Sequence, residues 1–441
     1  MQPVTVYSKN TSSRLVYVLD WIFNDVFKCG YHLILNEQDT TEFPFFISYG
    51  LELPNGLYIP DVGLLWEENI VHQKVDIDTW KGIPVIYSTD AADGLPFDLF
   101  SSVFYLLSRY EEYYDYTPDK HGRYPAEVSI LFKHALLSRP LIDEWLLELY
   151  KLLKVHVSQL TLEPFAYRPT YDIDIAFSYK NKGFFRTSGA YIRSLLRGDV
   201  KSIVERSKVL SGGARDPFDC FGWLNSLHAE TDVQPGYFIL AALRTTAYDK
   251  NISPANPAMQ SLIRELASEG RVGLHPSYFS TEATVFREEK NILEELTGRP
   301  ISSSRQHYVR MKLPDTYRTL IDRGITNDWS MGYGAALGFR AGTSRPFYWF
   351  DLESGVQTML RVHPFCFMDS TAHYELGLSA EEAFMELSNM SDKLQTVRGR
   401  LVTVFHNFSL GSEEEWKGWN KHYQELLIAA AKNKVRIADL T

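Results

Sequence analysis

The chain has 441 residues, enough for two or three domains that each bury a core of their own. Hydrophobic residues make up 45% of the chain and charged residues 23%, as in an ordinary globular protein, and the net charge of −10 argues against nucleic acid as a partner. The three cysteines, Cys29, Cys220 and Cys366, lie far apart and form no CxxC pair. We therefore expect neither a disulfide framework nor a thiolate zinc site.

The first residues, MQPVTVYSKN, contain no basic segment followed by an apolar one, and no later stretch is long and apolar enough to span a bilayer. This pattern is typical of a cytoplasmic protein, and also of a chain that has lost a leader. Residues 1–162 are predicted to form an N-terminal α/β domain of unknown role. Apolar periodicity predicts helices in RLVYVLDWIFNDVF, LPFDLFSSVFYLLSRYEEYY and RPLIDEWLLELYKLLKV, and strands in YHLIL and IPVIYS. PDKHGRYP, with Asp119 and His121, is predicted to be a turn first and a functional loop second.

A second domain is predicted over 163–441, beginning at EPFAYRP. Strand and helix patterns alternate in it, which indicates a parallel sheet with crossover helices; about seven such repeats would close into a barrel with its chemistry at the C-terminal strand ends. The predicted strands are 170–178, 236–242, 271–275, 301–308, 325–330, 358–365 and 401–407. An insertion at about 180–235 begins with many basic residues. It is interpreted as a solvated amphipathic helix pair, or else as a lid that attracts an anionic substrate or a lipid-phosphate carrier.

The stretch PTYDIDIAFSY places Asp172 and Asp174 two residues apart in the first of these strands. Side chains at i and i+2 of a strand face the same side, so the two carboxylates are predicted to point together. Such a pair is repulsive and costly to bury. A divalent cation bound by one aspartate would relieve the repulsion, and a neighbouring carboxylate could then serve as a base.

Further polar residues end the later strands of the second domain. Any one of them has an ordinary structural explanation, because a lone His at a strand end usually only forms hydrogen bonds. Their recurrence at successive strand ends indicates a shared site. These residues are His275; Arg305, His307 and Tyr308; Asp328 and Trp329; Arg340; His363 and Asp369; and His406.

Taken in order, these segments resemble the motifs of the polysaccharide deacetylases, carbohydrate esterases built on a distorted seven-stranded β/α barrel. The resemblance covers roughly residues 165–441, and the whole chain is similar to a two-domain bacterial subgroup of predicted deacetylases. It implies that Asp172 is the catalytic base and that Asp174 is a metal ligand. His275, in HPSYF, matches a metal-binding histidine. His406 stands where the family keeps its general acid.

The third motif of the family, Arg-x-Pro-Tyr, is matched here by RQHY. The resemblance implies that Arg305 orients the base and that the Tyr308 backbone N–H faces an oxyanion. Asp328 and Trp329 resemble the acidic residue and tryptophan that buttress the site. Trp329 is also assigned to substrate binding, together with Tyr278, Arg340 and His363. For Arg340 and Arg345, a loop pairing with Asp351 or Glu353 is the equal alternative.

The chain departs from the family at Phe279, where a second metal-binding histidine is usual. His307 stands where the family has proline, and it could supply the missing nitrogen or only hydrogen-bond to substrate or to Asp328. Two imidazoles and a carboxylate suit zinc best, with cobalt or nickel as alternatives.

The predicted function is a metal-dependent hydrolase that removes an N-acetyl group from a sugar or glycan intermediate. Two alternatives stay open. One is a glycan-binding pseudoenzyme that needs no metal, and the other is a hydrolase of a non-sugar amide or an O-acyl ester on the same barrel.

Overall fold

The computed structural model describes residues 3–91, 93–280, 283–433 and 435–437, and the chain forms two compact units. Unit 1 comprises residues 1–166, 311–366 and 389–401; unit 2 comprises residues 167–310, 367–388 and 402–441. The predicted domain boundary near residue 162 stays a prediction. Within the described ranges, no helix is long and apolar enough to cross a membrane.

Unit 1 contains a four-stranded parallel sheet in the order β2-β1-β3-β4, an antiparallel β5–β6 hairpin, and β13 paired antiparallel with β12 and parallel with β11. Its strands are β1 (Val4–Ser8), β2 (Tyr31–Ile34), β3 (Phe46–Tyr49), β4 (Gly56–Ile59), β5 (Ile77–Trp80), β6 (Ile83–Ile86), β11 (Asn327–Asp328), β12 (Phe347–Asp351) and β13 (Val356–Val362). Its helices are α1 (Ser13–Leu19), α2 (Leu99–Leu107), α3 (Ile130–Lys133), α4 (Leu141–Lys154) and α10 (Asp315–Asp322). The predicted helices and strands of residues 1–162 are present, although the first helix changes to a π-helix at Asp20.

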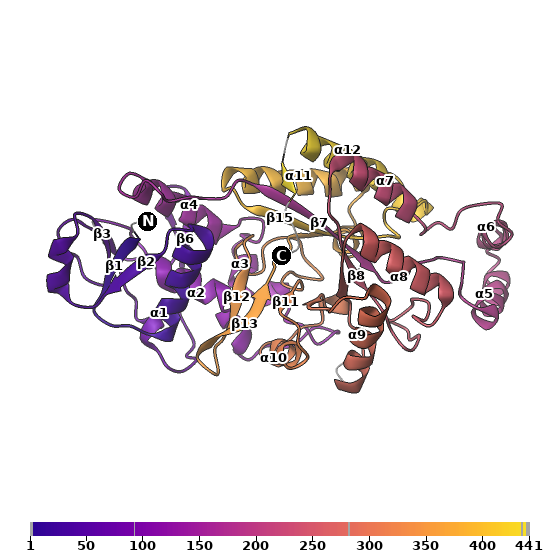
Figure 1. Ribbon diagram of the computed structural model, residues 1–441, viewed down its shortest axis with the longest axis horizontal. Helices are drawn as coiled ribbons and strands as arrows, with labels where there is room; N and C mark the ends of the chain where they lie inside the picture. Colours follow the sequence, from indigo (N-terminus) through magenta and orange to yellow (C-terminus); the bar gives the residue numbers. More distant parts are fainter. Residues whose placement is uncertain (1–2, 92, 281–282, 434, 438–441) are drawn as a thin grey trace. The chain divides into compact units, whose positions relative to one another are not determined.

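Unit 2 is built on parallel strands in the order β10-β9-β8-β7-β15-β14, with β16 also paired to β7 (Figure 1). The pairs β7–β8, β8–β9, β9–β10 and β14–β15 are parallel, so the predicted mixed α/β architecture with a parallel sheet is confirmed. The strand order has two ends, and the described strands do not form the predicted closed barrel. The strands are β7 (Ala166–Ile173), β8 (Gly236–Ile239), β9 (Arg271–Leu274), β10 (Ser303–Ser304), β14 (Phe367–Met368), β15 (Arg400–His406) and β16 (Arg436–Ile437).

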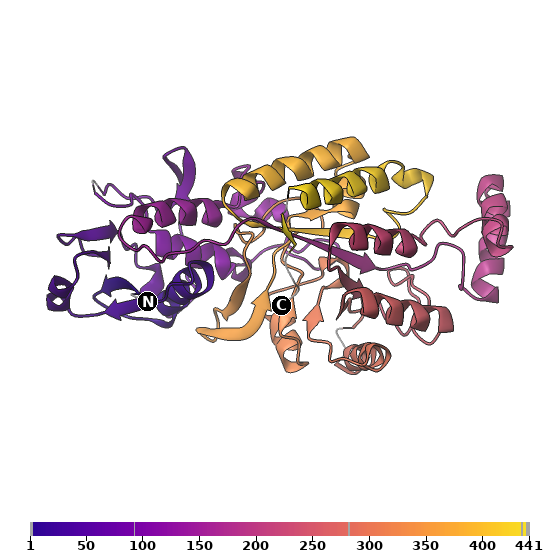
Figure 2. The ribbon, with the colours of Figure 1, turned by 45° about the horizontal axis from the view of Figure 1, so that its top comes forward.

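Helices alternate with these strands along the chain, because each parallel pair is joined by a crossover that buries an apolar helix face against the sheet. In Figures 1 and 2, α12 lies above β7 and β15, and α8 and α9 lie below them. The helices are α5 (Phe184–Leu196), α6 (Val200–Leu210), α7 (Phe221–Thr231), α8 (Pro257–Glu269), α9 (Ala283–Thr297), α12 (Trp419–Lys432) and α11 (Ala380–Thr396), which runs from unit 2 into unit 1. Ser379 caps α11 through the Glu382 backbone N–H, and Glu382 accepts the Ser379 N–H in return.

The core of unit 2 includes a polar contact between β7 and two helices. Tyr171 on β7 places its hydroxyl 2.6 Å from Nε2 of His228 on α7 and in contact with the Tyr423 hydroxyl on α12. Burial lowers the pKa of His228 to about 4. The imidazole is therefore neutral at pH 7 and packs in the core as an uncharged ring among aromatic side chains.

The low pKa of the buried His228 makes the free energy of unfolding depend on pH. The unfolded chain binds a proton at His228 below about pH 6.5, while the folded protein does so only near pH 4, so stability is lost as the pH falls between these values. From pH 7.5 to pH 5 we expect His228 to contribute a loss of about 2 kcal/mol in the free energy of unfolding. Urea unfolding at both pH values should show a smaller loss in His228→Gln, and an equal loss would contradict the prediction.

Candidate active site

Two aspartates lie at the C-terminal end of β7. Asp172 is in the strand, and Asp174 follows the last strand residue, Ile173. The Oδ2 atom of Asp172 is 3.8 Å, and the Oδ1 atom of Asp174 3.1 Å, from the same atom, Nε2 of His275. Both carboxylates thus approach one imidazole, as expected of side chains on the same side of a strand.

His275 follows β9, and its orientation is fixed by the neighbouring strand. Its Nδ1 lies 2.6 Å from the backbone carbonyl oxygen of Arg305. Because a carbonyl only accepts hydrogen bonds, Nδ1 carries a proton, and Nε2 is the ring atom that faces Asp174. A lone pair on Nε2 that faces a carboxylate needs a cation between the two, either a proton or a metal ion.

His307, just after β10, repeats this arrangement. Its Nδ1 is 3.1 Å from Oδ1 of Asp249, and its Nε2 is 3.4 Å from Oδ2 of Asp174. Asp249 is buried and also accepts hydrogen bonds from the Tyr278 backbone N–H and the Thr246 hydroxyl. A carboxylate behind a histidine in this way orients the ring and raises its basicity. Asp249 is not among the predicted site residues; the only signal for it in the sequence is its place in the loop after a predicted strand.

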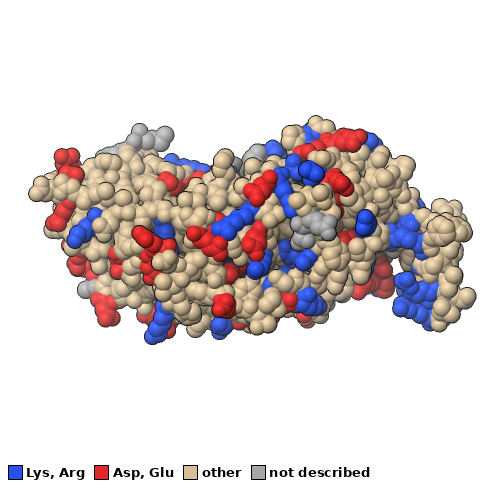
Figure 3. Space-filling model, turned by 90° about the horizontal axis from the view of Figure 1, so that it is seen from below, with Lys and Arg blue, Asp and Glu red and all other residues tan. Residues whose placement is uncertain are grey.

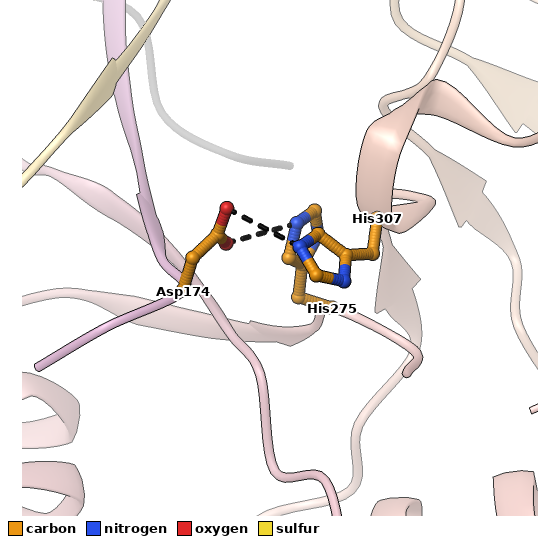
Figure 4. Close-up of side chains that lie close together, drawn as sticks. All are labelled: Asp174, His275 and His307. Carbon is orange, nitrogen blue, oxygen red and sulfur yellow. Dashed lines mark ion pairs between the residues drawn. The ribbon is translucent and has the colours of Figure 1, made fainter. Parts of the chain in front are cut away.

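Asp174, His275 and His307 therefore converge (Figure 4): one ligand atom from each lies within 4.8 Å of the others. The Oδ1 atom of Asp174 is buried without a hydrogen-bond partner, although His275 Nε2 is 3.1 Å away. Burial tends to raise the pKa of Asp174, but the two histidines hold it well below its usual range. A carboxylate that faces two imidazoles, one at each oxygen, and has one oxygen without a hydrogen bond is a donor set that fits a divalent metal such as zinc, cobalt or nickel.

Asp172 is held by Arg305. The guanidinium donates from Nη1 to Oδ1 of Asp172 at 2.7 Å and from Nη2 to the Thr170 hydroxyl at 2.8 Å, and it lies over the Phe238 ring. All of these groups are in unit 2, on or beside β7, β8 and β10. The predicted contact between Arg305 and Asp172 is therefore present, and it leaves Oδ2 of Asp172 on the side of His275.

His406, the last residue of β15, is a third histidine close to Asp174. Its Nδ1 is 2.6 Å from Oδ1 of Asp369, and its Nε2 is 3.5 Å from Oδ2 of Asp174. Burial lowers the pKa of His406, but the charges of Asp369 and Asp174 outweigh burial and raise it well above its usual value. Asp369 also accepts the His406 backbone N–H, so the pair is rigidly placed.

The segment after His307 has an unusual backbone. Tyr308 and Val309 have φ values of 58° and 53°, a left-handed conformation that is costly for a β-branched residue. Tyr278 is buried, stacks on Tyr248 with ring centroids 3.9 Å apart, and lies under the Arg310 guanidinium. Strain of this kind is often found at functional sites.

The remaining predicted site residues belong to unit 1. Asp328 accepts hydrogen bonds from the Tyr317 hydroxyl and from Ser330, and Trp329 stacks on His363 with centroids 4.0 Å apart. Nε2 of His363 lies 2.9 Å from the Asn327 side-chain oxygen. Their roles in a substrate pocket or as a buttress stay predictions.

Arg340 and Arg345 are buried in unit 1, and each has a carboxylate close by. Arg340 donates from Nε and Nη2 to Glu112 and from Nη1 to the Gly332 carbonyl. Nε of Arg345 is 3.4 Å from Asp143. The alternative pairing with Asp351 or Glu353 is wrong, because those two carboxylates pair with Arg318.

Phe279, which the motif resemblance aligns with a second metal-binding histidine, is 54% exposed and packs edge-on against the rings of Tyr248 and Tyr278. In the described residues, Asp174, His275 and His307 are three candidate metal ligands. They stand just after β7, β9 and β10, with β8 between β7 and β9 in the sheet.

Comparison with known proteins gives a family match for part of the chain only. Residues 4–158 match a family of unknown function, DUF7033, and this segment lies within the predicted N-terminal domain. No curated protein matches the sequence.

Solved structures similar to this chain include the following three, all of low sequence identity. A candidate polysaccharide deacetylase from Mycobacterium smegmatis has 15% identity and a TM-score of 0.41, over 63% of this chain and 88% of that one. The Puue allantoinase has 14% identity and a TM-score of 0.41, over 62% and 86% of the two chains. A candidate polysaccharide deacetylase from Pseudomonas aeruginosa PAO1 has 15% identity and a TM-score of 0.40, over 62% and 88%.

Proposed function

We propose that this protein is a metal-dependent hydrolase that removes an N-acetyl group from a sugar or polysaccharide intermediate. The observation that carries the proposal is the convergence of Asp174, His275 and His307 beside Asp172, a second carboxylate held by Arg305. The order of these residues along the chain also follows the motifs of the polysaccharide deacetylases. Zinc is the metal that this donor set suits best, with cobalt or nickel as alternatives.

In this proposal Asp172 is the base. Its Oδ1 is occupied by Arg305, so Oδ2, on the side of the three ligands, is the atom that accepts the proton of the attacking water. Arg305 fixes the carboxylate in place through its hydrogen bond to Oδ1. A divalent ion, when bound by Asp174, His275 and His307, supplies the Lewis acidity that activates water and polarises a carbonyl.

His406 is the proposed general acid. Asp369 holds its Nδ1 and stabilises the protonated ring, so Nε2 can deliver a proton to the nitrogen of the departing amine. The Tyr308 backbone N–H is proposed to donate a hydrogen bond to the oxyanion, and the left-handed backbone there is the feature that would aim it. Tyr278 is proposed to contact the substrate.

The experiment that tests this function is acetate release. Protein stripped of metal and then reloaded with zinc should release acetate from N-acetylated amino sugars, and the stripped protein should not. Release from O-acetyl esters or from non-sugar amides alone would keep the hydrolase and replace the substrate. If the zinc-loaded protein binds glycans but releases nothing from any of these substrates, the hydrolase proposal is wrong and the binding-protein alternative takes its place.

A further inference from the structure

Helices α5 and α6 form a hairpin that projects from unit 2, at the right of Figures 1 and 2. Its base is fixed on both sides. Asp216 accepts the backbone N–H groups of Ser178, Tyr179 and Lys180, and Arg186 donates to the carbonyls of Lys250 and Asn251. The base of the hairpin is thus fixed to the rest of unit 2. Any function specific to the hairpin depends on the side chains at its surface.

The two helices pack against each other through polar and aromatic groups. Arg206 of α6 is buried, stacks on the Tyr179 and Tyr191 rings, and lies 3.4 Å from the Ser194 hydroxyl. The Tyr191 hydroxyl is 2.9 Å from that of Ser207. A hairpin in water normally buries its large apolar side chains between the helices and turns its charges outward. Here a guanidinium occupies the inside.

The large apolar side chains are on the outside. Six of them are between 60% and 89% exposed: Phe184, Phe185, Ile192, Leu195, Leu196 and Val200. Phe185, Ile192 and Leu196 recur at i, i+7 and i+11, so they share one face of α5. Exposed apolar surface of this extent on one element marks an interaction site.

The charge of the hairpin is opposite to that of the whole chain. Residues 180–210 hold eight Lys or Arg and two Asp or Glu, a net charge of +6, whereas the chain carries −10. Seen from below, the projecting hairpin in Figure 3 carries Lys and Arg beside uncharged surface. A basic helix with exposed Phe and Leu is the composition of segments that lie in the interface of an anionic bilayer.

We propose that the α5–α6 hairpin docks on the surface of a membrane that contains anionic phospholipids. The outward Phe and Leu side chains enter the boundary between headgroups and acyl chains, and the exposed basic side chains contact the lipid phosphates; these are Arg193, Arg197, Lys201 and Lys208. This occupant satisfies the apolar face and the positive charge together, whereas an uncharged apolar partner would leave the charge unmatched. The hairpin would hold unit 2 at a membrane surface, which goes beyond the proposed hydrolase activity.

The test is co-sedimentation of the full chain with phosphatidylcholine vesicles, with and without phosphatidylglycerol. We expect binding to the anionic vesicles at least about tenfold tighter than to the neutral ones, and weaker at high salt. Leu195→Ser with Leu196→Ser, and separately Arg193→Glu with Arg197→Glu, should each lower the partition coefficient by about tenfold or more. Val155→Ser with Met359→Ser, which replace equally exposed apolar side chains elsewhere, should leave it unchanged.

Two outcomes would overturn the proposal: no anionic preference, or variants that bind as well as the wild type. Concentration-dependent self-association that is lost in the Leu195→Ser, Leu196→Ser protein would make a second copy of the chain the occupant instead. Asp174→Ala, at the candidate metal site, should bind vesicles like the wild type. Failure of the hydrolase proposal therefore leaves this result unaffected.

Discussion

Asp172→Asn is expected to lower kcat for acetate release by about 100- to 10,000-fold, the range for loss of a general base. An amide cannot accept the proton of the attacking water, but its oxygen can still accept the hydrogen bond from Arg305 that Oδ1 of Asp172 receives at 2.7 Å. The three proposed metal ligands are untouched, so zinc content measured by elemental mass spectrometry should stay near that of the wild type. The variant thus separates proton transfer from metal binding.

The control for this experiment is another aspartate paired with an arginine. Asp351 receives two hydrogen bonds from Arg318 in unit 1 and is no part of the candidate site. The Asp351→Asn variant should lose an ion pair of the same kind, but its kcat for acetate release should stay near that of the wild type. If Asp172→Asn retains turnover within a few-fold of the wild type, Asp172 is not the base. If it loses zinc together with activity, Asp172 is instead part of the metal site.

The sequence could predict those parts of the site that local patterns control. Strand alternation placed Asp172 and Asp174 on one side of β7, and the ends of apolar runs located His275 and His406. In a parallel sheet neighbouring strands end at the same edge, so residues distant in sequence were expected to meet there. Asp174, His275 and His307 do meet.

Other features depend on long-range packing that a local pattern does not contain. Asp249 could not be recognised as the partner of His307, because the loop after β8 had no periodicity to orient it. For Arg340 the sequence predicts a place in the substrate pocket or a loop ion pair. In the structure its carboxylate partner is Glu112, more than 200 positions away in the chain. The closed barrel was inferred from the number of repeats, whereas closure depends on strand tilt and stagger.

His307→Ala is expected to weaken zinc binding by more than about 100-fold, beyond the effect usual for residues that only support a ligand. The imidazole faces Asp174 with Nε2, and no other nitrogen in the Asp174–His275–His307 group could replace it. Asp249→Asn should give an intermediate loss of about 10- to 100-fold, because it leaves the ligand and removes the carboxylate that orients it. Competition with a chromophoric chelator measures all of these affinities.

Phe279→Ala is the matched control, since the motif resemblance aligns Phe279 with a second metal-binding histidine. Its ring is half-exposed and packs against the rings of Tyr248 and Tyr278, so zinc affinity should stay within about threefold of the wild type. Unchanged affinity in His307→Ala would remove His307 from the metal site and leave one imidazole and one carboxylate. Two protein ligands are too few for a zinc site of the usual kind, and the glycan-binding alternative would then explain the cluster better. If zinc affinity falls least in Phe279→Ala, more in Asp249→Asn and most in His307→Ala, the third ligand is His307. It would then come from the strand after the one that precedes Phe279, with Asp249 as the carboxylate that orients it.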